Sequence, residues 1–297
     1  MKNDNVLILG STGFLGGYFQ KALGNLGIWH TSEITNPTGK FSNQYISSKL
    51  ETKRDVERLL DSVSTFKVIN CIALSDIDKC EKNPLAANWL NTELPRLLSE
   101  KCKSIGAQFI HISTDAVFSG EEPLTEEIRE PKPKSVYGLT KYQGEIAVLK
   151  EYPNSIICRV NFVGWNPRGK SLFNFFYTNL KANRAVTGFQ DIFFTPMYAA
   201  DTVNSILELA NIGESGLFHI VGSERISKFE FGKLVAQRMN VDHSLIREGS
   251  FQGSQFATTR TSDLSLSNAK IKSLGIEIPT VASGIERLVK EAESKNA

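Results

Sequence analysis

A glycine-rich segment close to the N-terminus, Gly10-Ser-Thr-Gly13-Phe-Leu-Gly16, most constrains what this chain can fold into. It follows the apolar run Val6–Leu9, typical of a buried strand, and it opens Thr12–Leu26, which has the apolar spacing of a helix. In such a strand–loop–helix unit the first glycine permits a tight turn, the second lets the backbone approach a pyrophosphate, and the third lets helix and strand pack closely. Free N–H groups and the positive end of the helix dipole also favour phosphate there. The segment therefore predicts a dinucleotide site made by Gly10, Ser11, Thr12, Gly13, Phe14, Leu15 and Gly16.

Strand-like and helix-like segments alternate through the first two thirds of the chain. Short apolar runs are separated by polar turns from longer segments that have helical spacing. The expected strands are Gly27–Thr31, Lys67–Ala73, Gln108–Ser113 and Ser155–Val160, and the expected helices are Asp55–Val63, Pro84–Ile105 and Tyr137–Tyr152. Repeated strand–helix units build a parallel sheet that is covered by helices on both faces. The pattern therefore predicts an α/β fold with a doubly wound parallel sheet of the Rossmann type.

The regular alternation of strand-like and helix-like segments ends after Asn161. This change predicts a second, smaller C-terminal domain for substrate binding. Helices are expected at Ser171–Asn183, at Asp201–Ala210 with Asp201 as N-cap, from Ser227 to about Met239, and at Val281–Glu293. Ser227 and Glu230 fit a capping box. A strand is expected at Leu217–Val221, and Glu248–Thr261 has the composition of an exposed or ligand-facing loop. We expect the nucleotide domain to comprise residues 1–164 and 196–222, and the substrate domain residues 165–195 and 223–297, interwoven along the chain.

Composition excludes some partners. The net charge of +2, from 34 basic and 32 acidic side chains, gives no reason to expect nucleic acid or an anionic membrane as partner. No apolar stretch is long enough for a membrane span, and Val6–Leu9 is too short for the core of a signal peptide. The four cysteines form no C-x-x-C pair and are expected to be buried thiols. A cytoplasmic location follows from these features.

A second motif, Tyr137-Gly-Leu-Thr-Lys141, carries the chemistry, together with Ser113-Thr114-Asp115 before it. Residues four apart on a helix share one face, so the phenol and the ammonium are neighbours. A buried ammonium beside a phenol favours phenolate and is expected to lower the pKa of Tyr137. Such a tyrosine can exchange a proton with a substrate oxygen near neutral pH, and the hydroxyl of Thr114 can bind the same oxygen. The remaining helix positions Leu139, Tyr142, Ile146 and Leu149 are expected to form the packed stripe.

The residues after the second predicted strand bear on coenzyme choice. An acid about 20 residues beyond the glycine-rich loop binds the ribose 2′-OH in NAD-binding proteins. Glu33 is a candidate for that role, whereas Thr31 and Ser32, with His30 nearby, can bind a 2′-phosphate. The sequence favours NADP and leaves NAD open.

These motifs, in this order, resemble the extended short-chain dehydrogenases/reductases, and within them the dTDP-4-dehydrorhamnose reductase-like group. Further segments carry the resemblance along nearly the whole chain: Asn70–Glu81, Asn91, His111–Gly120, Tyr137–Glu145, Arg159–Gly164, Thr195–Asp201 and Gly216–Gly222. The resemblance implies a nicotinamide cofactor, a nucleotide-activated sugar as substrate, and hydride transfer to a 4-keto group. It implies Thr114, Tyr137 and Lys141 as the catalytic set: Tyr137 donates a proton to the carbonyl oxygen, Thr114 binds that oxygen, and Lys141 also holds the nicotinamide ribose.

The same resemblance implies further site residues. The glycine-rich loop, Thr31 and Ser32 have already been named as cofactor-binding. The resemblance adds to them Ile72, Ala73, Leu74, Ser75, Asn91, Tyr137, Lys141, Asn161, Phe162 and Val163. It gives as substrate-binding Ser75, Asp115, Ala116, Asn161 and Thr195. The chain departs from the family pattern at Ala116, where an aromatic residue is usual, and at Ser119, where an acid is usual. Because these departures surround the substrate, they leave the identity of the sugar open.

Other polar and charged residues are assigned structural or binding roles. Asp76, Asp78 and Glu81 are expected to cap or pair near a helix start, so no metal is assigned, and His111, His219 and Arg159 are expected to be structural. The cationic side chains Arg168, Lys170 and Arg260 are candidates for a substrate diphosphate. A homodimer is possible.

Two other functions remain beside the reductase. An epimerase of the same family, which recycles a bound cofactor, is open. Dehydratases that resemble this family carry Thr-Asp-Glu with the glutamate as general acid, and because this chain has Ala116 in that place the resemblance disfavours a dehydratase. The other is a non-catalytic, NADP-binding regulatory subunit.

Overall fold

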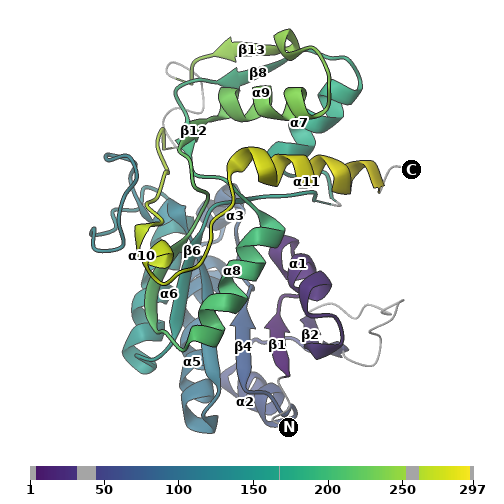
Figure 1. Ribbon diagram of the computed structural model, residues 1–297. Coiled ribbons are helices and arrows are strands. Elements are labelled where there is room, and N and C mark those ends of the chain that lie inside the picture. The colour runs from purple at the N-terminus through teal and green to yellow at the C-terminus, as the bar shows by residue number, and fades with distance from the viewer. Residues whose placement is uncertain (1–4, 32–44, 167, 252–260, 295–297) are drawn as a thin grey trace. The chain divides into compact units, whose positions relative to one another are not determined.

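The computed structural model describes residues 5–31, 45–166, 168–251 and 261–294 (Figure 1). The chain divides into two compact units, and each passes through the sequence more than once. The first unit comprises Met1–Val117, Ser135–Arg159 and Ile206–Phe218, and the second comprises Phe118–Lys134, Val160–Ser205 and His219–Ala297.

A seven-stranded sheet organises the first unit, in the order β11-β6-β5-β4-β1-β2-β3. Its strands are β1 (Val6–Leu9), β2 (Gly27–Thr31), β3 (Tyr45–Ser47), β4 (Lys67–Asn70), β5 (Gln108–Thr114), β6 (Ile156–Val160) and β11 (Gly216–Ile220). β1 pairs in parallel with both β2 and β4, so the strand order reverses beside β1. Ligands of open α/β sheets bind at such a reversal, outside the carboxyl ends of the strands. The predicted α/β fold with a Rossmann-type sheet is confirmed.

Helices cover the sheet of the first unit. They are α1 (Phe14–Leu23) with the short turn η1 (Gly24–Leu26), α2 (Lys53–Asp61), α3 (Ile77–Lys82), α4 (Pro84–Asn88), η3 (Trp89–Glu93), α5 (Leu94–Ile105), η4 (Asp115–Val117) and α6 (Val136–Glu151). The segment expected as one helix, Pro84–Ile105, contains a π-helical turn at η3. Polar caps fix the helix starts: Thr52 forms a capping box with Asp55, and Ser135 caps α6.

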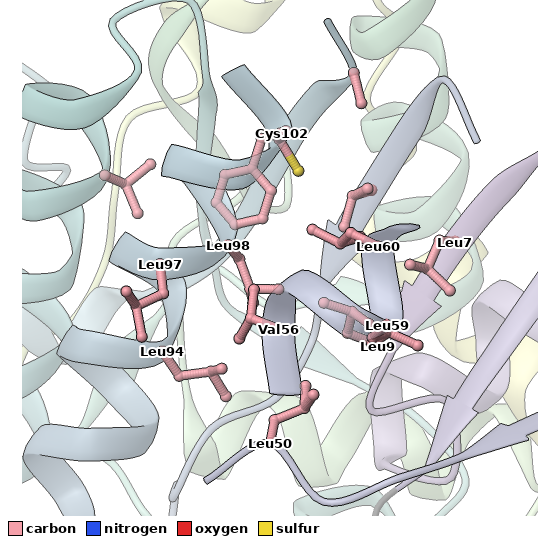
Figure 2. Close-up of a cluster of buried hydrophobic side chains, with 14 of the residues drawn as sticks. Leu7, Leu9, Leu50, Val56, Leu59, Leu60, Leu94, Leu97, Leu98 and Cys102 are labelled. Atoms are coloured by element: carbon pink, nitrogen blue, oxygen red, sulfur yellow. The ribbon is translucent and has the colours of Figure 1, made fainter. Parts of the chain in front are cut away.

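One face of the sheet carries a continuous apolar core (Figure 2). Alternate residues of a strand point to the same face. Leu7 and Leu9 of β1 therefore pack against apolar side chains of α2 and α5. Val68 of β4 and Phe109 of β5 belong to the same core. The helix side of this core is formed by Val56, Leu59, Leu60, Leu94, Leu97, Leu98 and Cys102.

The described residues of the second unit form a core of their own and three two-stranded sheets. β7 (Phe162–Val163) pairs with β10 (Met197–Tyr198), β8 (Val186–Phe189) with β13 (Ile246–Gly249), and β9 (Phe193–Phe194) with β12 (Ile226–Ser227). Its helices are α7 (Leu172–Lys181), α9 (Lys228–Arg238), η5 (His243–Leu245), α10 (Ala269–Ser273) and α11 (Val281–Ser294), and α8 (Ala199–Ile212) begins in it. Apolar residues of α7, α9 and α11 form one buried cluster. The predicted capping box of Ser227 and Glu230 is confirmed.

Two local expectations were wrong, and the start of a third segment was misplaced. Asp201 is not an N-cap, because α8 already begins at Ala199; its carboxylate instead accepts hydrogen bonds from Arg287. The strand expected to reach Ala73 ends at Asn70, whose side chain accepts the Ile72 N–H and turns the backbone. Glu248–Thr261 begins inside β13, and residues 252–260 lie outside the described part of the chain.

The buried face of α6 also differs from the expectation. Leu139 and Ile146 are 44% and 50% exposed, so the stripe that they were expected to form is not the packed one. The buried face instead contains Lys141 and Glu145. A Cβ atom on Gly144 would lie 2.1 Å from the backbone oxygen of Asn91, so this glycine permits the close packing of α6 on η3. Among the described residues, no helix is both long and apolar enough to cross a membrane.

Candidate active site

The glycine-rich loop follows β1 and leads into α1, as the sequence predicted. Gly10 has a φ of 76°, a backbone conformation that favours glycine, and an added Cβ atom would lie 3.1 Å from the Ile72 nitrogen. A Cβ atom on Gly16 would lie 2.3 Å from the Gly10 oxygen. Gly13 is the N-cap of α1 and supplies no side-chain hydrogen bond to the first turn. Because glycine has no side chain, Gly13 leaves the N–H groups in the first turn of α1 without a side-chain cap, which fits the binding of a pyrophosphate.

The neighbouring polar residues tie this loop to the end of β2. The hydroxyl of Ser11 donates to the His30 oxygen at 2.9 Å, and the hydroxyls of Thr12 and Thr31 lie 3.5 Å apart. Nε2 of His30 contacts the oxygen atoms of Ser48 at 3.0 and 3.1 Å. Burial lowers the pKa of His30 to about 4, so this ring carries no positive charge toward a 2′-phosphate at neutral pH. Ser32 and Glu33 lie outside the described residues.

Two buried asparagines hold the backbone that follows β4. The side chain of Asn70 accepts the Ile72 N–H at 3.0 Å. Asn91 accepts the Leu74 N–H at 2.9 Å and donates to the Leu74 oxygen at 3.1 Å. Ile72, Ala73 and Leu74 remain partly exposed and Ser75 is exposed. Asn91 thus positions the expected cofactor-binding segment 72–75, and its own contact with a cofactor stays a prediction.

Thr114 and Tyr137 come together across β5 and α6. Thr114 ends β5 and Tyr137 lies in the first turn of α6, and hydrogen bonding by the Thr114 side chain favours a lower pKa of Tyr137. The Thr114 hydroxyl also lies 3.0 Å from the Asp115 carboxylate and accepts the Ala116 N–H. Thr114 and Asp115 are therefore both close enough to Tyr137 to influence its pKa.

The prediction that the pKa of Tyr137 is lowered was wrong. Burial raises its pKa to about 12, the hydrogen bond with Thr114 acts in the opposite direction, and the Asp115 carboxylate adds to the increase. Lys141 is not among the groups that lower this pKa. The side chain of Lys141 instead donates to the Ile112 oxygen at 2.6 Å and lies 3.0 Å from Nε2 of His111.

Lys141 is itself perturbed. It is 1% exposed, and burial lowers its pKa to about 8, although the Glu145 carboxylate opposes that shift. The pKa of His111 lies well below its ordinary value because the ring is buried and Lys141 is close. A buried lysine whose pKa is strongly lowered is typical of a functional site.

A buried ion pair supports this face of α6. Arg159 donates to Glu145 from Nε at 2.9 Å and from Nη2 at 2.7 Å, and the hydroxyl of Ser113 donates to the same carboxylate at 2.5 Å. The expected structural role of Arg159 is therefore confirmed, but sequence reasoning missed its partner. The signal was present, because Tyr137, Lys141 and Glu145 recur at intervals of four on a helix.

The remaining candidates lie in the second unit or at its boundary. Val163 is buried in the apolar core of that unit, and Asn161 accepts the Met197 N–H through its backbone oxygen. Thr195 is buried, and its hydroxyl accepts the Leu266 N–H at 3.2 Å. Phe162 belongs to β7. Arg168 and Lys170 are exposed, Arg260 lies outside the described residues, and contacts of all these residues with a substrate stay predictions.

Other polar clusters have structural explanations. Asp76 caps α3 by accepting the Lys79 N–H, as expected. His219 is buried, and its backbone N–H donates to Glu127. All four cysteines are free thiols; Cys80, Cys102 and Cys158 are buried as expected, whereas Cys71 is only partly buried. Within the described part of the chain no group of His, Cys, Asp or Glu is arranged to hold a metal ion.

The fold and the motifs are those of the extended short-chain dehydrogenases/reductases. The model of the RmlD substrate binding domain family matches residues 4–294, and the chain belongs to this family. The resemblance inferred from the motifs is thereby confirmed.

Several of the proteins to which this chain is similar are named as reductases. The probable low-salt glycan biosynthesis reductase Agl14 of Haloferax volcanii is 35% identical over 246 residues, which are 80% of this chain and 81% of that protein. The dTDP-4-dehydrorhamnose reductase of Mycobacterium tuberculosis is 32% identical over 186 residues, which are 61% of either chain. The structure of a dTDP-4-dehydrorhamnose reductase from Bacillus anthracis, in complex with NADP, superposes with a TM-score of 0.82 at 23% identity, over 97% of this chain and 99% of that one.

Proposed function

We propose that this chain is an NAD(P)H-dependent reductase of a nucleotide-activated 4-keto-6-deoxy sugar, with NADPH as the preferred coenzyme. The observation that carries the proposal is the contact of Thr114 with Tyr137, with Lys141 one helix turn further on, in the unit that also contains the glycine-rich loop. The names of the relatives support a reductase and a nucleotide sugar. Biosynthesis of a deoxysugar or a surface polysaccharide, in the cytoplasm, is part of the proposal.

Each of the proposed catalytic and cofactor-binding residues has a separate role in such a reduction. The bound coenzyme supplies the hydride. Tyr137 donates its phenolic proton to the carbonyl oxygen, and Thr114 holds that oxygen by a hydrogen bond. Lys141 holds the hydroxyls of the nicotinamide ribose. The start of α1 binds the pyrophosphate through backbone N–H groups.

Residues outside the catalytic set are proposed to bind the substrate. We place Ser75, Asp115 and Ala116 near the reacting sugar, and we assign Asn161 and Thr195, with the second unit, to the rest of the substrate. A homodimer is part of the same proposal, and light scattering on the purified protein tests it.

The experiment is NADPH and NADH oxidation by the purified protein against a panel of nucleotide-linked 4-keto-6-deoxy sugars. Tyr137→Phe should lower kcat by at least about 100-fold, because the proton donor is lost, while NADPH still binds. Tyr142→Phe removes a phenol from the same helix and serves as the matched control, with kcat unchanged. Lys141→Ala should weaken both binding and turnover. Wild-type kcat in Tyr137→Phe would show that the proton donor is misassigned.

The same assay separates the alternatives. An epimerase gives an isomerised sugar without net oxidation of added coenzyme. A regulatory subunit binds NADPH, turns over no sugar, and co-purifies with a second protein, and in that case Tyr137→Phe has no effect.

A further inference from the structure

A chain of buried hydrogen bonds connects Lys141 with the backbone of segment 72–75. The Ile72 N–H donates to Oδ1 of Asn70 at 3.0 Å. Nδ2 of Asn70 lies 3.1 Å from Nδ1 of His111, and Nε2 of His111 lies 3.0 Å from Nζ of Lys141. Asn70 and His111 are direct partners in the parallel register of β4 and β5, so their side chains point to the same face of the sheet.

The direction of each hydrogen bond follows from the one before it. A backbone N–H can only donate, so the Asn70 atom facing Ile72 is the carbonyl oxygen. The amide NH₂ of Asn70 then faces His111 and can only donate to Nδ1. A neutral imidazole carries one proton, which must therefore be on Nε2, the nitrogen that faces Lys141. This proton meets a lone pair only if Lys141 is an uncharged amine.

The opposite charge state of Lys141 demands a different set of bonds. An ammonium donates to Nε2, which places the imidazole proton on Nδ1 and requires an acceptor from Asn70. Asn70 then has to turn its oxygen toward His111, and the Ile72 N–H loses its acceptor. A wrongly oriented Asn70 amide and an Ile72 N–H without an acceptor are both costly, because Asn70 and His111 have no exposed surface at which water could replace the lost hydrogen bonds.

Other charged and titratable groups near Lys141 do not remove the link between its charge and the position of the proton on His111. Glu145 on α6 favours the ammonium, whereas burial raises the pKa of the Cys71 thiol to about 12, so this thiol stays uncharged where Lys141 titrates. The Glu145 carboxylate is itself engaged by Arg159 and Ser113. On α6, Tyr137 lies one turn before Lys141, and burial raises its pKa to about 12, so this phenol is uncharged near neutral pH. Burial lowers the pKa of Lys141 to about 8, so the two charge states exchange close to neutral pH.

We propose that His111 and Asn70 are positioning residues that couple the charge of Lys141 to the backbone of segment 72–75. When Lys141 becomes an ammonium, one proton is taken up from solvent. His111 stays neutral, since its proton leaves Nε2 and a proton is gained at Nδ1. The Asn70 amide turns over and the Ile72 N–H is released. The importance of this coupling for catalysis rests on the proposed function, in which segment 72–75 and Lys141 both hold the coenzyme.

Nuclear magnetic resonance of the ligand-free protein tests the coupling without any turnover. The chain has four histidines, so ¹⁵N-labelled rings give a small spectrum, and His111→Gln assigns the ring of interest. Between pH 6 and pH 10.5, we expect the His111 tautomer, the ε-carbon of Lys141 and the Ile72 amide to change with one common midpoint. That midpoint should lie well below the ordinary lysine value of about 10.4.

Two variants of Asn70 and one control sharpen the test. Asn70→Leu removes the amide, so protonation of Lys141 no longer costs a backbone hydrogen bond, and the midpoint should rise by about one pH unit. Asn70→Asp offers only acceptors, so His111 should keep its proton on Nδ1 throughout. Asn91→Leu removes a second buried amide from the same segment and should leave the midpoint unchanged.

Each outcome decides the question. A His111 tautomer that is constant while Lys141 titrates, or a Lys141 midpoint near 10.4, overturns the coupling. A common midpoint that moves in Asn70→Leu, and not in Asn91→Leu, supports it. A protein that shows the coupled titration but oxidises no NADPH keeps this inference and loses the proposed function, and a reductase without the titration does the reverse.

Discussion

The buried pair of Glu145 and Arg159 should behave as one unit in a double-mutant cycle. The two side chains are 4% and 2% exposed and share two hydrogen bonds. Arg159→Met removes the charge and keeps much of the apolar stem, so the carboxylate of Glu145 remains buried with the hydroxyl of Ser113 as a donor. Leaving one ion of such a pair uncompensated costs about 3–5 kcal/mol of the free energy of unfolding.

The double variant Arg159→Met/Glu145→Leu tests whether the cost comes from the unpaired charge. Replacing both ions of a buried pair by apolar side chains is often neutral. We therefore expect the double variant to recover most of the loss, with a coupling free energy of about 3 kcal/mol. Urea unfolding at pH 7, followed by circular dichroism, measures all four proteins.

An exposed pair provides the control for this cycle. Lys290 and Glu286 form an ion pair one turn apart on α11, with side chains 70% and 48% exposed. Lys290→Met should leave the unfolding curve unchanged. The reasoning fails if Arg159→Met costs less than about 1 kcal/mol, or if the effects of the two substitutions simply add.

Three further predictions concern the loop, acid stability and the proton donor. Gly16→Ala places a Cβ atom 2.3 Å from the Gly10 oxygen, so the Kd for NADPH, measured by fluorescence, should rise at least about 10-fold, while Gly17→Ala, which meets nothing within 4 Å, should bind normally. His30 has its pKa lowered to about 4 in the folded chain, so the unfolded chain binds more protons between about pH 6.5 and 4, and the urea midpoint should fall as the pH falls through that window; in His30→Gln this part of the pH dependence should vanish. Thr114→Val removes the hydrogen bond that lowers the pKa of Tyr137, so kcat should fall at least about 10-fold and Thr114→Ser should restore it; equal kcat in Thr114→Val and wild type would refute the role of this hydroxyl.

Local signals in the sequence predicted much of the fold. The glycines at positions 10, 13 and 16 specify the strand–loop–helix unit because each meets a backbone constraint within that unit. Ser227 and Glu230 specify a helix start through two hydrogen bonds that span three residues. The order of strands and helices follows from the same kind of local pattern, and the parallel sheet follows from that order.

Pairings between distant elements were not predictable in the same way. Apolar periodicity assigned the wrong face of α6, because the buried polar residue Glu145 is compensated by Arg159 from β6. The contact of Asn70 with His111 depends on the register of β4 and β5, which no local pattern encodes. The pKa of Tyr137 depends on distances and burial, so the motif alone gave its direction incorrectly.

The raised pKa of Tyr137 bears on the direction of the proposed reaction. At neutral pH a phenol with a pKa of about 12 holds its proton, which is the form that a reductase needs in order to donate it. Donation creates a phenolate in a buried site, and that charge has to be stabilised there. The hydrogen bond with Thr114 stabilises phenolate, and Asp115 opposes it. A positive charge on Lys141, one helix turn away, would stabilise the phenolate further, and this charge is the one that His111 and Asn70 would control. The same substitution of Asn70 that shifts the titration of Lys141 should therefore also shift the pH profile of reduction.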